Sequence, residues 1–295
     1  MVLFSRLIFT CVLLIGSQTS LAQGPLLHEI SFAGGKIILL GGTDVPEHNW
    51  LNGQVQEAIA VSDSLWLELP PEDADKGITP FREDIYPSVN MHPVAIEQGY
   101  GNLRFADYLD VTMGERSVVE SQRLDLNGSW YQPMKPWVAY YYFAYNFWDK
   151  QEINLISPET ELLSQFRSTN KAIHSLFPDR ATFFRFLGAM SDTTQTQYFQ
   201  SLYNIFDWQR SGEYTSRFEW VNGAPDTQFV DAHRQQTPLF YRYMYQQRNQ
   251  AIAEQLLSVL EEGGNHFVYL ELNRTLGPHS IQSILKSLGA RVLTR

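Results

Sequence analysis

Residues 266–293, HFVYLELNRTLGPHSIQSILKSLGARVL, decide the fold. His266 to Leu272 is a continuous run of strand-favouring residues, which is typical of a buried strand. Apolar residues then recur at helical spacing between Ile281 and Leu288, and Arg291 to Leu293 returns to a strand pattern. The stretch therefore predicts a strand, a helix and a second strand, whose connection is right-handed if the two strands are parallel.

A long helix is expected just before this unit. Thr237-Pro238 is typical of a helix start, because proline suits the first helical position. Ile252, Leu256 and Leu260 follow at spacings of four, as one face of a helix requires. Gly263-Gly264 is expected to end it.

The other end of the chain predicts strands as well. Glu29–Phe32 and Lys36–Leu40 have the pattern of two short strands, joined by a hairpin turn at Gly34-Gly35. Val55–Ala60 follows with a helical pattern, and Ser64–Leu69 is typical of a buried strand. A hairpin, a helix and a strand suit a mixed sheet covered by helices.

The middle of the chain is different in character. From about residue 72 to residue 240 the pattern is mostly helical and irregular, with a loop expected over Arg217–Pro225. Neither an internal repeat nor a low-complexity linker interrupts it. We therefore expect a single α/β domain over residues 23–295, with a mixed sheet built from the N- and C-terminal segments and a large, mainly helical insertion between them.

Residues 1–22 have the pattern of a secretory signal peptide. Arg6 provides the basic start, Leu7–Ile15 the short apolar run and Ser20-Leu21-Ala22 the cleavage site. The apolar run is too short to cross a bilayer, so no integral membrane segment is expected after cleavage. The protein is expected to be exported to the periplasm or the extracellular space. The chain's single cysteine, Cys11, falls in this segment, so the mature protein must be held together by its core.

Composition excludes several classes of protein. The formal net charge is −10 and no basic cluster interrupts the acidic background, which argues against nucleic acid binding. Apolar residues make up 44% of the chain, as in a globular protein. The sequence contains no nucleophile elbow, phosphate loop, dinucleotide fingerprint or His-Glu-x-x-His helix. A peptide or protein partner is compatible with these features.

Several landmarks resemble the TraB/GumN family, which includes the Tiki-type metalloproteases. At the C-terminal end these are Arg248-Asn249, the Leu276-Gly277 turn and the closing Gly289–Val292. At the N-terminal end, Lys36–Asp44 and Ala58–Pro70 are similar to the family's opening strands. The resemblance covers nearly the whole mature chain, and it implies an α/β fold with a metal site at the strand ends.

The residues that would bind the metal differ from the family pattern. Such families carry a Gly-x-x-His motif at the end of each of two strands. This chain has Asp44 in place of the first histidine and Arg274 in place of the second, whereas Glu68 and Arg248 are kept. Because a guanidinium has no lone pair to offer a metal, one hypothesis is an exported protein with a degenerate metal site and a non-catalytic binding or accessory role.

The alternative hypothesis is a divergent metal-dependent hydrolase, similar to a metallopeptidase. Asp44, Glu68 and Glu271 would bind Mn²⁺, Co²⁺ or Ca²⁺ through oxygen ligands, and Glu271 or His48 would act on a bound water. Glu68, Arg248 and His48 would then be catalytic, with Arg248 holding a substrate carboxylate. Each has a structural interpretation too: acids after strands cap turns, a loop histidine is solvated, and Arg248 forms an ion pair.

The aromatic run Trp137–Trp148, WVAYYYFAYNFW, has two interpretations. On a helix it would be apolar all round, which predicts burial between layers. Alternatively its tyrosines form a platform for a sugar ring or an apolar peptide, because each offers a ring face and a hydroxyl. The second interpretation supports a third hypothesis, a carbohydrate-related binding protein.

Overall fold

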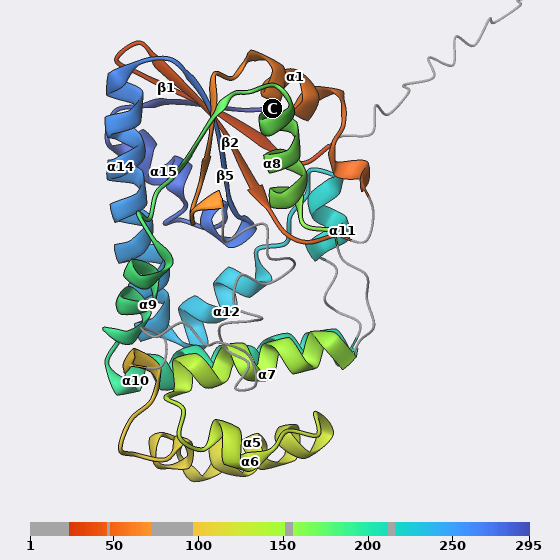
Figure 1. Ribbon diagram of the computed structural model, residues 1–295, viewed down its shortest axis with the longest axis vertical. Coiled ribbons are helices and arrows are strands. Elements are labelled where there is room, and N and C mark those ends of the chain that lie inside the picture. The colour runs from red at the N-terminus through yellow and green to blue at the C-terminus, as the bar shows by residue number, and fades with distance from the viewer. Residues whose placement is uncertain (1–23, 46–47, 72–96, 151–155, 212–215) are drawn as a thin grey trace, which may run out of the picture.

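The computed structural model describes residues 24–45, 48–71, 97–150, 156–211 and 216–295 (Figure 1). The signal peptide expected over residues 1–22 lies outside the described residues.

Six strands of the described residues form one mixed sheet in the order β4-β3-β5-β2-β1-β6. The chain's two ends supply β1 (Leu27–Phe32), β2 (Gly35–Gly42), β3 (Ser64–Leu67), β5 (Asn265–Glu271) and β6 (Arg291–Thr294). The β4, β3, β5 and β2 strands pair in parallel, whereas β1 is antiparallel to both β2 and β6. The predicted mixed α/β sheet from the N- and C-terminal segments is confirmed.

The insertion is mainly helical, as predicted, but it also contributes a strand that the sequence did not indicate. Edge strand β4 (Ala172–Ser175) pairs in parallel with β3. It follows α8 (Pro158–Ser168), whose Leu162, Leu163 and Phe166 pack on the sheet. A four-residue edge strand carries too short an alternation to be recognised among helices.

The central strands bury both faces. Side chains alternate along a strand, so Ile37 and Leu39 of β2 face one layer of helices while Ile38 and Leu40 face the other. The first layer consists of α14 (Arg248–Glu262) and α15 (Ile281–Ser287), and the second contains α1 (Gly53–Val61) and α8. The sheet is therefore sandwiched between helices (Figure 1).

The rest of the insertion forms a helical lobe below the sheet in Figure 1, with its own aromatic core. Its elements are η2 (Phe105–Tyr108), α5 (Val111–Arg123), α6 (Gly128–Tyr131), α7 (Pro136–Lys150), α9 (Arg180–Gly188), α10 (Asp192–Ser211) and α12 (Gln228–Gln236). The two long helices pack on each other, with the rings of Phe147 of α7 and Phe206 of α10 stacked at 4.2 Å. This core places α7 and α10 across from the ends of the strands.

The loop expected over Arg217–Pro225 is wrong in its first half, which belongs to α11 (Ser216–Val221). The indole of Trp220 stacks on Trp50 and its Nε1 donates a hydrogen bond to the carbonyl of Gly41. Burial of this tryptophan against the sheet outweighs the local turn signal of the following residues.

The hairpin between β1 and β2 is shifted by one residue from its expected position. The turn residues are Ala33 and Gly34, with φ angles of 49° and 97°, and Phe32 pairs with Gly35. Positive φ at both central residues matches the twist that a two-residue hairpin requires.

The helix expected from Thr237 to Gly263 is confirmed but is not a regular α-helix throughout. It comprises α13 (Pro238–Tyr241), a π-helical segment η3 (Arg242–Gln247) and α14, ended by Gly263 at φ 85°. In η3 the amide of Arg248 bonds to the carbonyl of Tyr243 rather than Met244. Such π turns are rare and recur at functional sites, and no spacing in the sequence indicates this one.

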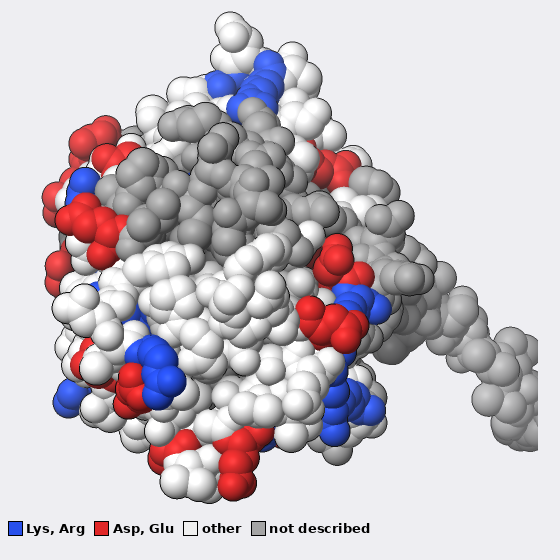
Figure 2. All heavy atoms as spheres, turned by 60° about the horizontal axis from the view of Figure 1, so that its bottom comes forward, with Lys and Arg blue, Asp and Glu red and all other residues white. Residues whose placement is uncertain are grey.

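The surface on the lobe side carries mixed charge. In the view of Figure 2, Lys and Arg side chains lie among Asp and Glu rather than in one basic patch. A nucleic acid backbone needs a continuous basic surface, which this face does not offer. Among the described residues, no helix has the length and hydropathy of a membrane span.

Candidate functional site

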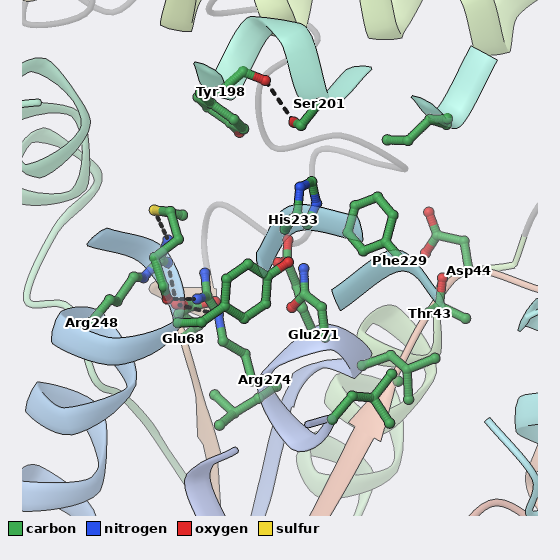
Figure 3. A pocket seen from close by; sticks show the side chains of 18 of the residues that line it. Thr43, Asp44, Glu68, Tyr198, Ser201, Phe229, His233, Arg248, Glu271 and Arg274 are labelled. Atoms are coloured by element: carbon green, nitrogen blue, oxygen red, sulfur yellow. Dashed lines mark hydrogen bonds and ion pairs between the residues drawn. The ribbon is translucent and has the colours of Figure 1, made fainter. Parts of the chain in front are cut away.

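A cavity of about 370 Å³ lies between the helical lobe and the carboxyl ends of β2, β3 and β5 (Figure 3). The parallel pairing of β2 and β5 sets Gly42 beside Glu271, so the residues that follow these strands meet at one edge of the sheet. Asp44, Glu68, Arg248 and Glu271 all line this cavity, and so does Arg274. The structure thus brings the predicted residues from both ends of the chain to one place.

Two glycines let the walls close over the end of β2. A Cβ at Gly41 would overlap the side chain of Thr275 in η4 (Leu272–Thr275), and one at Gly42 would overlap the ring of Tyr269. Neither glycine has a positive φ angle. Their role is to allow close approach of neighbouring side chains.

One end of the cavity is a buried ion network. Glu68 pairs with Arg248, and Oε1 of Glu68 lies 3.9 Å from Nε of Arg274. Arg274 also donates from Nη1 to the carbonyl of Met244 at 2.6 Å and to Oδ1 of Asn249 at 3.2 Å. The side chains of Arg248 and Arg274 are only 4% and 2% exposed, so two guanidiniums share one carboxylate away from solvent.

Arg248 is also enclosed by aromatic rings. Its Cζ lies 5.3, 4.6 and 5.4 Å from the ring centroids of Phe177, Phe183 and Phe186. Ring faces attract a guanidinium, and with Glu68 they fix its position. Burial, and then the charge of Arg274, lowers the pKa of Arg248. Of the two roles open to this arginine from sequence, the structure contains the ion pair with Glu68.

The pKa of the neighbouring Arg274 is shifted in the opposite direction. Burial lowers its pKa, but Glu68 and Glu271 outweigh burial and raise it above the usual value. Arg274, which the resemblance places at the second motif histidine, is therefore a permanently charged cation beside Glu68.

The other end of the cavity is acidic. Figure 3 shows Thr43 and Asp44 on the opposite side of the view from Arg248. Burial raises the pKa of Tyr269, and the charges of Asp44, Glu159 and Glu271 raise it further. Three carboxylates therefore act on one tyrosine hydroxyl at this end.

Stacked aromatic rings form the wall opposite the strands. The ring of Tyr198 on α10 lies 4.1 Å from that of Tyr140 on α7 and 4.6 Å from that of Phe240 on α13. Tyr198 also shares a hydrogen bond with Tyr141, and burial raises the pKa of both hydroxyls. The two faces of Tyr198 are therefore covered by Tyr140 and Phe240, and the stack closes this wall of the cavity.

The aromatic run Trp137–Trp148 is divided between two environments. Trp137 and Phe143 are fully buried in the core of the lobe, as the burial interpretation predicts. Tyr140, Tyr141 and Trp148 line the cavity, as the platform interpretation requires. Each interpretation therefore describes a different face of the same helix.

His233 on α12 lines the cavity, although no role was predicted for it from the sequence. The side chain is 1% exposed, 4.2 Å from the ring of Phe229, with Nδ1 3.2 Å from Oγ1 of Thr237. Burial lowers its pKa to about 3, so the imidazole is neutral near pH 7. No motif surrounds it in the sequence, and only the packing of the lobe brings it to the strand ends.

The sequence profile described as the TraB/PrgY/gumN family matches residues 26–293. The chain belongs to the TraB/PrgY/gumN family. The match includes both ends of the chain that build the cavity and the insertion between them. No curated protein and no solved structure matches the chain significantly.

The cavity of this TraB/PrgY/gumN protein does not fit a divalent metal ion. Among the described residues, no group of three or more His, Cys, Asp and Glu lies close enough to hold one. Glu68 is already engaged by Arg248 and Arg274, whose charges would oppose a further cation at that place. The metal-ligand roles of Asp44, Glu68 and Glu271 stay predictions of the hydrolase hypothesis.

His48 begins the short helix η1 (His48–Trp50), which follows β2 in the chain. Its side chain lies outside the described part of the structure, so its role as a metal ligand or general base also stays a prediction.

Proposed function

We propose that this TraB/PrgY/gumN family member is a non-catalytic binding protein whose cavity takes a peptide or another small ligand. The observation that carries the proposal is Arg274. It stands where the resemblance implies a metal-binding histidine, and its guanidinium lies beside Glu68. A guanidinium cannot coordinate a metal, but it supplies a positive charge at that place. The internal cation supports a site built to bind rather than to activate water.

The remaining groups of the cavity support the same proposal. A general base works best with a pKa near the pH at which the enzyme operates, and His233 has a pKa of about 3. Glu68 is held between two arginines. The hydrolase alternative has one observation in its favour, since Asp44, Glu68 and Glu271 line the same cavity.

Metal content separates these two functions. The mature protein is purified without added ions, its metals are measured by mass spectrometry, and its thermal shift is recorded with Mn²⁺, Co²⁺ and Ca²⁺. Hydrolysis is followed on a mixed peptide library. We expect far less than one ion per chain, no shift and no cleavage. One tightly held ion per chain, lost in Asp44→Ala but kept in the control Glu254→Ala at an exposed position of α14, would establish the hydrolase alternative.

Export of the protein is part of the proposal. It is supported by the signal-peptide pattern of residues 1–22, with cleavage expected before Gln23. Mass spectrometry of the N-terminus of protein expressed with its full sequence tests this. A chain that begins at Gln23 in the exported fraction is expected, and an intact, retained N-terminus would contradict it.

A further inference from the structure

The imidazole of His233 is a polar group in an apolar part of the cavity wall (Figure 3). The side chain is 1% exposed, and the rings of Phe229, Phe240 and Tyr245 lie 4.2, 5.0 and 5.7 Å from its centroid. Its Nδ1 lies 3.2 Å from Oγ1 of Thr237, whereas no described residue forms a hydrogen bond with Nε2. Because buried polar atoms are normally paired, Nε2 is left for a group inside the cavity.

The hydroxyl of Thr237 decides which ring nitrogen carries the proton. Its Oγ1 lies 3.1 Å from the carbonyl oxygen of His233, to which a threonine four residues later in a helix commonly donates. A hydroxyl has only one proton to give, so Oγ1 must accept from Nδ1. With a pKa of about 3 the imidazole is neutral near pH 7, and its one proton is therefore on Nδ1. Nε2 keeps a free lone pair and is a hydrogen-bond acceptor.

We infer that Nε2 of His233 accepts a hydrogen bond from the ligand of this cavity, and that the ligand presents a neutral O–H or N–H donor on an aromatic or other apolar group. The inference rests on the proposed binding function and names the chemistry of its ligand. The rings of Phe229 and Phe240 suit the apolar body of such a group, whereas a charged group would be desolvated among them. A tyrosine side chain of a peptide presents this donor, and so does a free phenol.

Thr237 is a positioning residue in this arrangement, because it acts on the ligand only through the imidazole. It is fully buried and is not among the described residues that line the cavity. Although it precedes α13, its side chain makes no capping hydrogen bond there. Thr237→Val therefore keeps the shape of the side chain and removes the hydroxyl. In this variant the proton of the imidazole is free to move to Nε2, which then no longer accepts.

The position of the proton is measured by nitrogen NMR of the mature protein labelled at its histidine nitrogens, at pH 7. The signals of His233 are identified by their loss in His233→Gln. We expect a protonated Nδ1 and an unprotonated Nε2, and in Thr237→Val a shift of the proton toward Nε2. A purely structural role of Thr237 would leave the two signals unchanged. A protonated Nε2 in the unchanged protein would overturn the inference.

Titration followed by NMR tests the ligand class. The probes form two pairs that differ by one hydroxyl: acetyl-Ala-Tyr-Ala-amide with its phenylalanine counterpart, and para-cresol with toluene. We expect the hydroxyl member of a pair to bind about three- to tenfold more tightly, as one added hydrogen bond provides. A preference seen with the peptides identifies a peptide source, and one seen with para-cresol alone identifies a free phenol.

Matched variants assign the preference to His233. His233→Phe keeps an aromatic ring and removes the acceptor, so the two members of each pair should bind equally. Thr237→Val should reduce the preference as the proton moves to Nε2. The control His174→Phe makes the same change at an exposed position of β4 outside the cavity wall, and it should leave the preference unchanged.

Three results of the titrations would overturn the inference. Equal binding of both members of each pair would mean that the cavity does not recognise the donor. A preference that survives in His233→Phe would mean that another group recognises it. If none of the probes binds, the inference about His233 fails, and the separate measurements of metal content and peptide hydrolysis decide whether the binding function fails with it.

Discussion

The two ends of the cavity differ in their charged side chains. At one end, the carboxylate of Glu68 pairs with the buried guanidiniums of both Arg248 and Arg274. At the other end, burial and the charges of Asp44, Glu159 and Glu271 raise the pKa of Tyr269, and Glu271 also acts on both arginines. The comparison indicates that the first end stabilises the fold, whereas the carboxylates of the second end line the cavity.

This division follows from which elements supply each end. The ion network joins the strand end that carries Glu68 to α14 and η4, so it ties the sheet to the helix that covers it. The π-helical segment takes part, because its Met244 carbonyl accepts from Arg274. Removing a charge from this end should therefore cost stability, and removing one from the acidic end should not.

The largest loss of stability is expected from Arg274→Met. The substitution leaves Glu68 with one cationic partner and removes the donor to Met244 and Asn249, which should lower the free energy of unfolding by about 3–5 kcal/mol. Urea unfolding measures it. The control Arg234→Met removes an exposed pair with Asp231 and should cost less than about 1 kcal/mol. Equal effects of the two substitutions would mean that the network does not stabilise the fold.

Acid should destabilise the protein through His233. Because burial depresses the folded-state pKa of this imidazole from 6.5 to about 3, the unfolded chain binds a proton that the folded chain does not within that window. The free energy of unfolding from this group is then fully present above about pH 6.5 and falls by about 3 kcal/mol on reaching about pH 4.

The variant His233→Gln tests this dependence. It keeps a group able to hydrogen-bond Thr237 but does not titrate, so the loss of stability between about pH 7 and pH 4 should be smaller than in the unchanged protein by roughly that amount. Unfolding in urea at several pH values gives the difference. Identical pH profiles for the two proteins would show that the pKa of His233 is the same in the folded and unfolded states, and would contradict the effect of burial.

The strand side of the cavity could be predicted from the sequence. Asp44 and Glu271 each follow or end an apolar strand, and neighbouring parallel strands bring such residues to one edge of a sheet. The resemblance then indicated that the first and last segments are neighbours. The sequence did not indicate the buried network of Glu68, Arg248 and Arg274. Arg274 was interpreted only as a residue that replaces a histidine, and no ion pair with Glu68 was predicted for it.

The lobe side of the cavity could not be predicted. Tyr198 and His233 reach it from helices with no motif and no special spacing, and Tyr140 lies in a run that looks uniformly apolar. Which face of such a helix is buried depends on how the lobe packs against the sheet, and periodicity alone does not specify that packing. For the same reason the π turn and strand β4 were found only in the structure.

The close approach at the end of β2 should make Gly42 sensitive to a single added methyl group. A Cβ there meets the ring of Tyr269, so Gly42→Ala should force the ring or the strand to move and lower stability by about 1–3 kcal/mol. The control is Gly114→Ala in α5, where a Cβ meets nothing and alanine favours the helix, so stability should rise by about 0.5–1 kcal/mol. Thermal unfolding compares them, and a neutral Gly42→Ala would contradict the packing argument.

The smallest change in stability is expected from a substitution of Glu271 at the acidic end. Glu271 is exposed, so its attraction to Arg248 and Arg274 is screened by solvent, and Glu271→Gln should change the free energy of unfolding by less than about 0.5 kcal/mol. Glu68→Gln, which leaves both buried guanidiniums without a carboxylate, should cost several times more. Urea unfolding of the two variants side by side measures the contrast. If Glu271→Gln were as destabilising as Glu68→Gln, Glu271 would belong to the stabilising network.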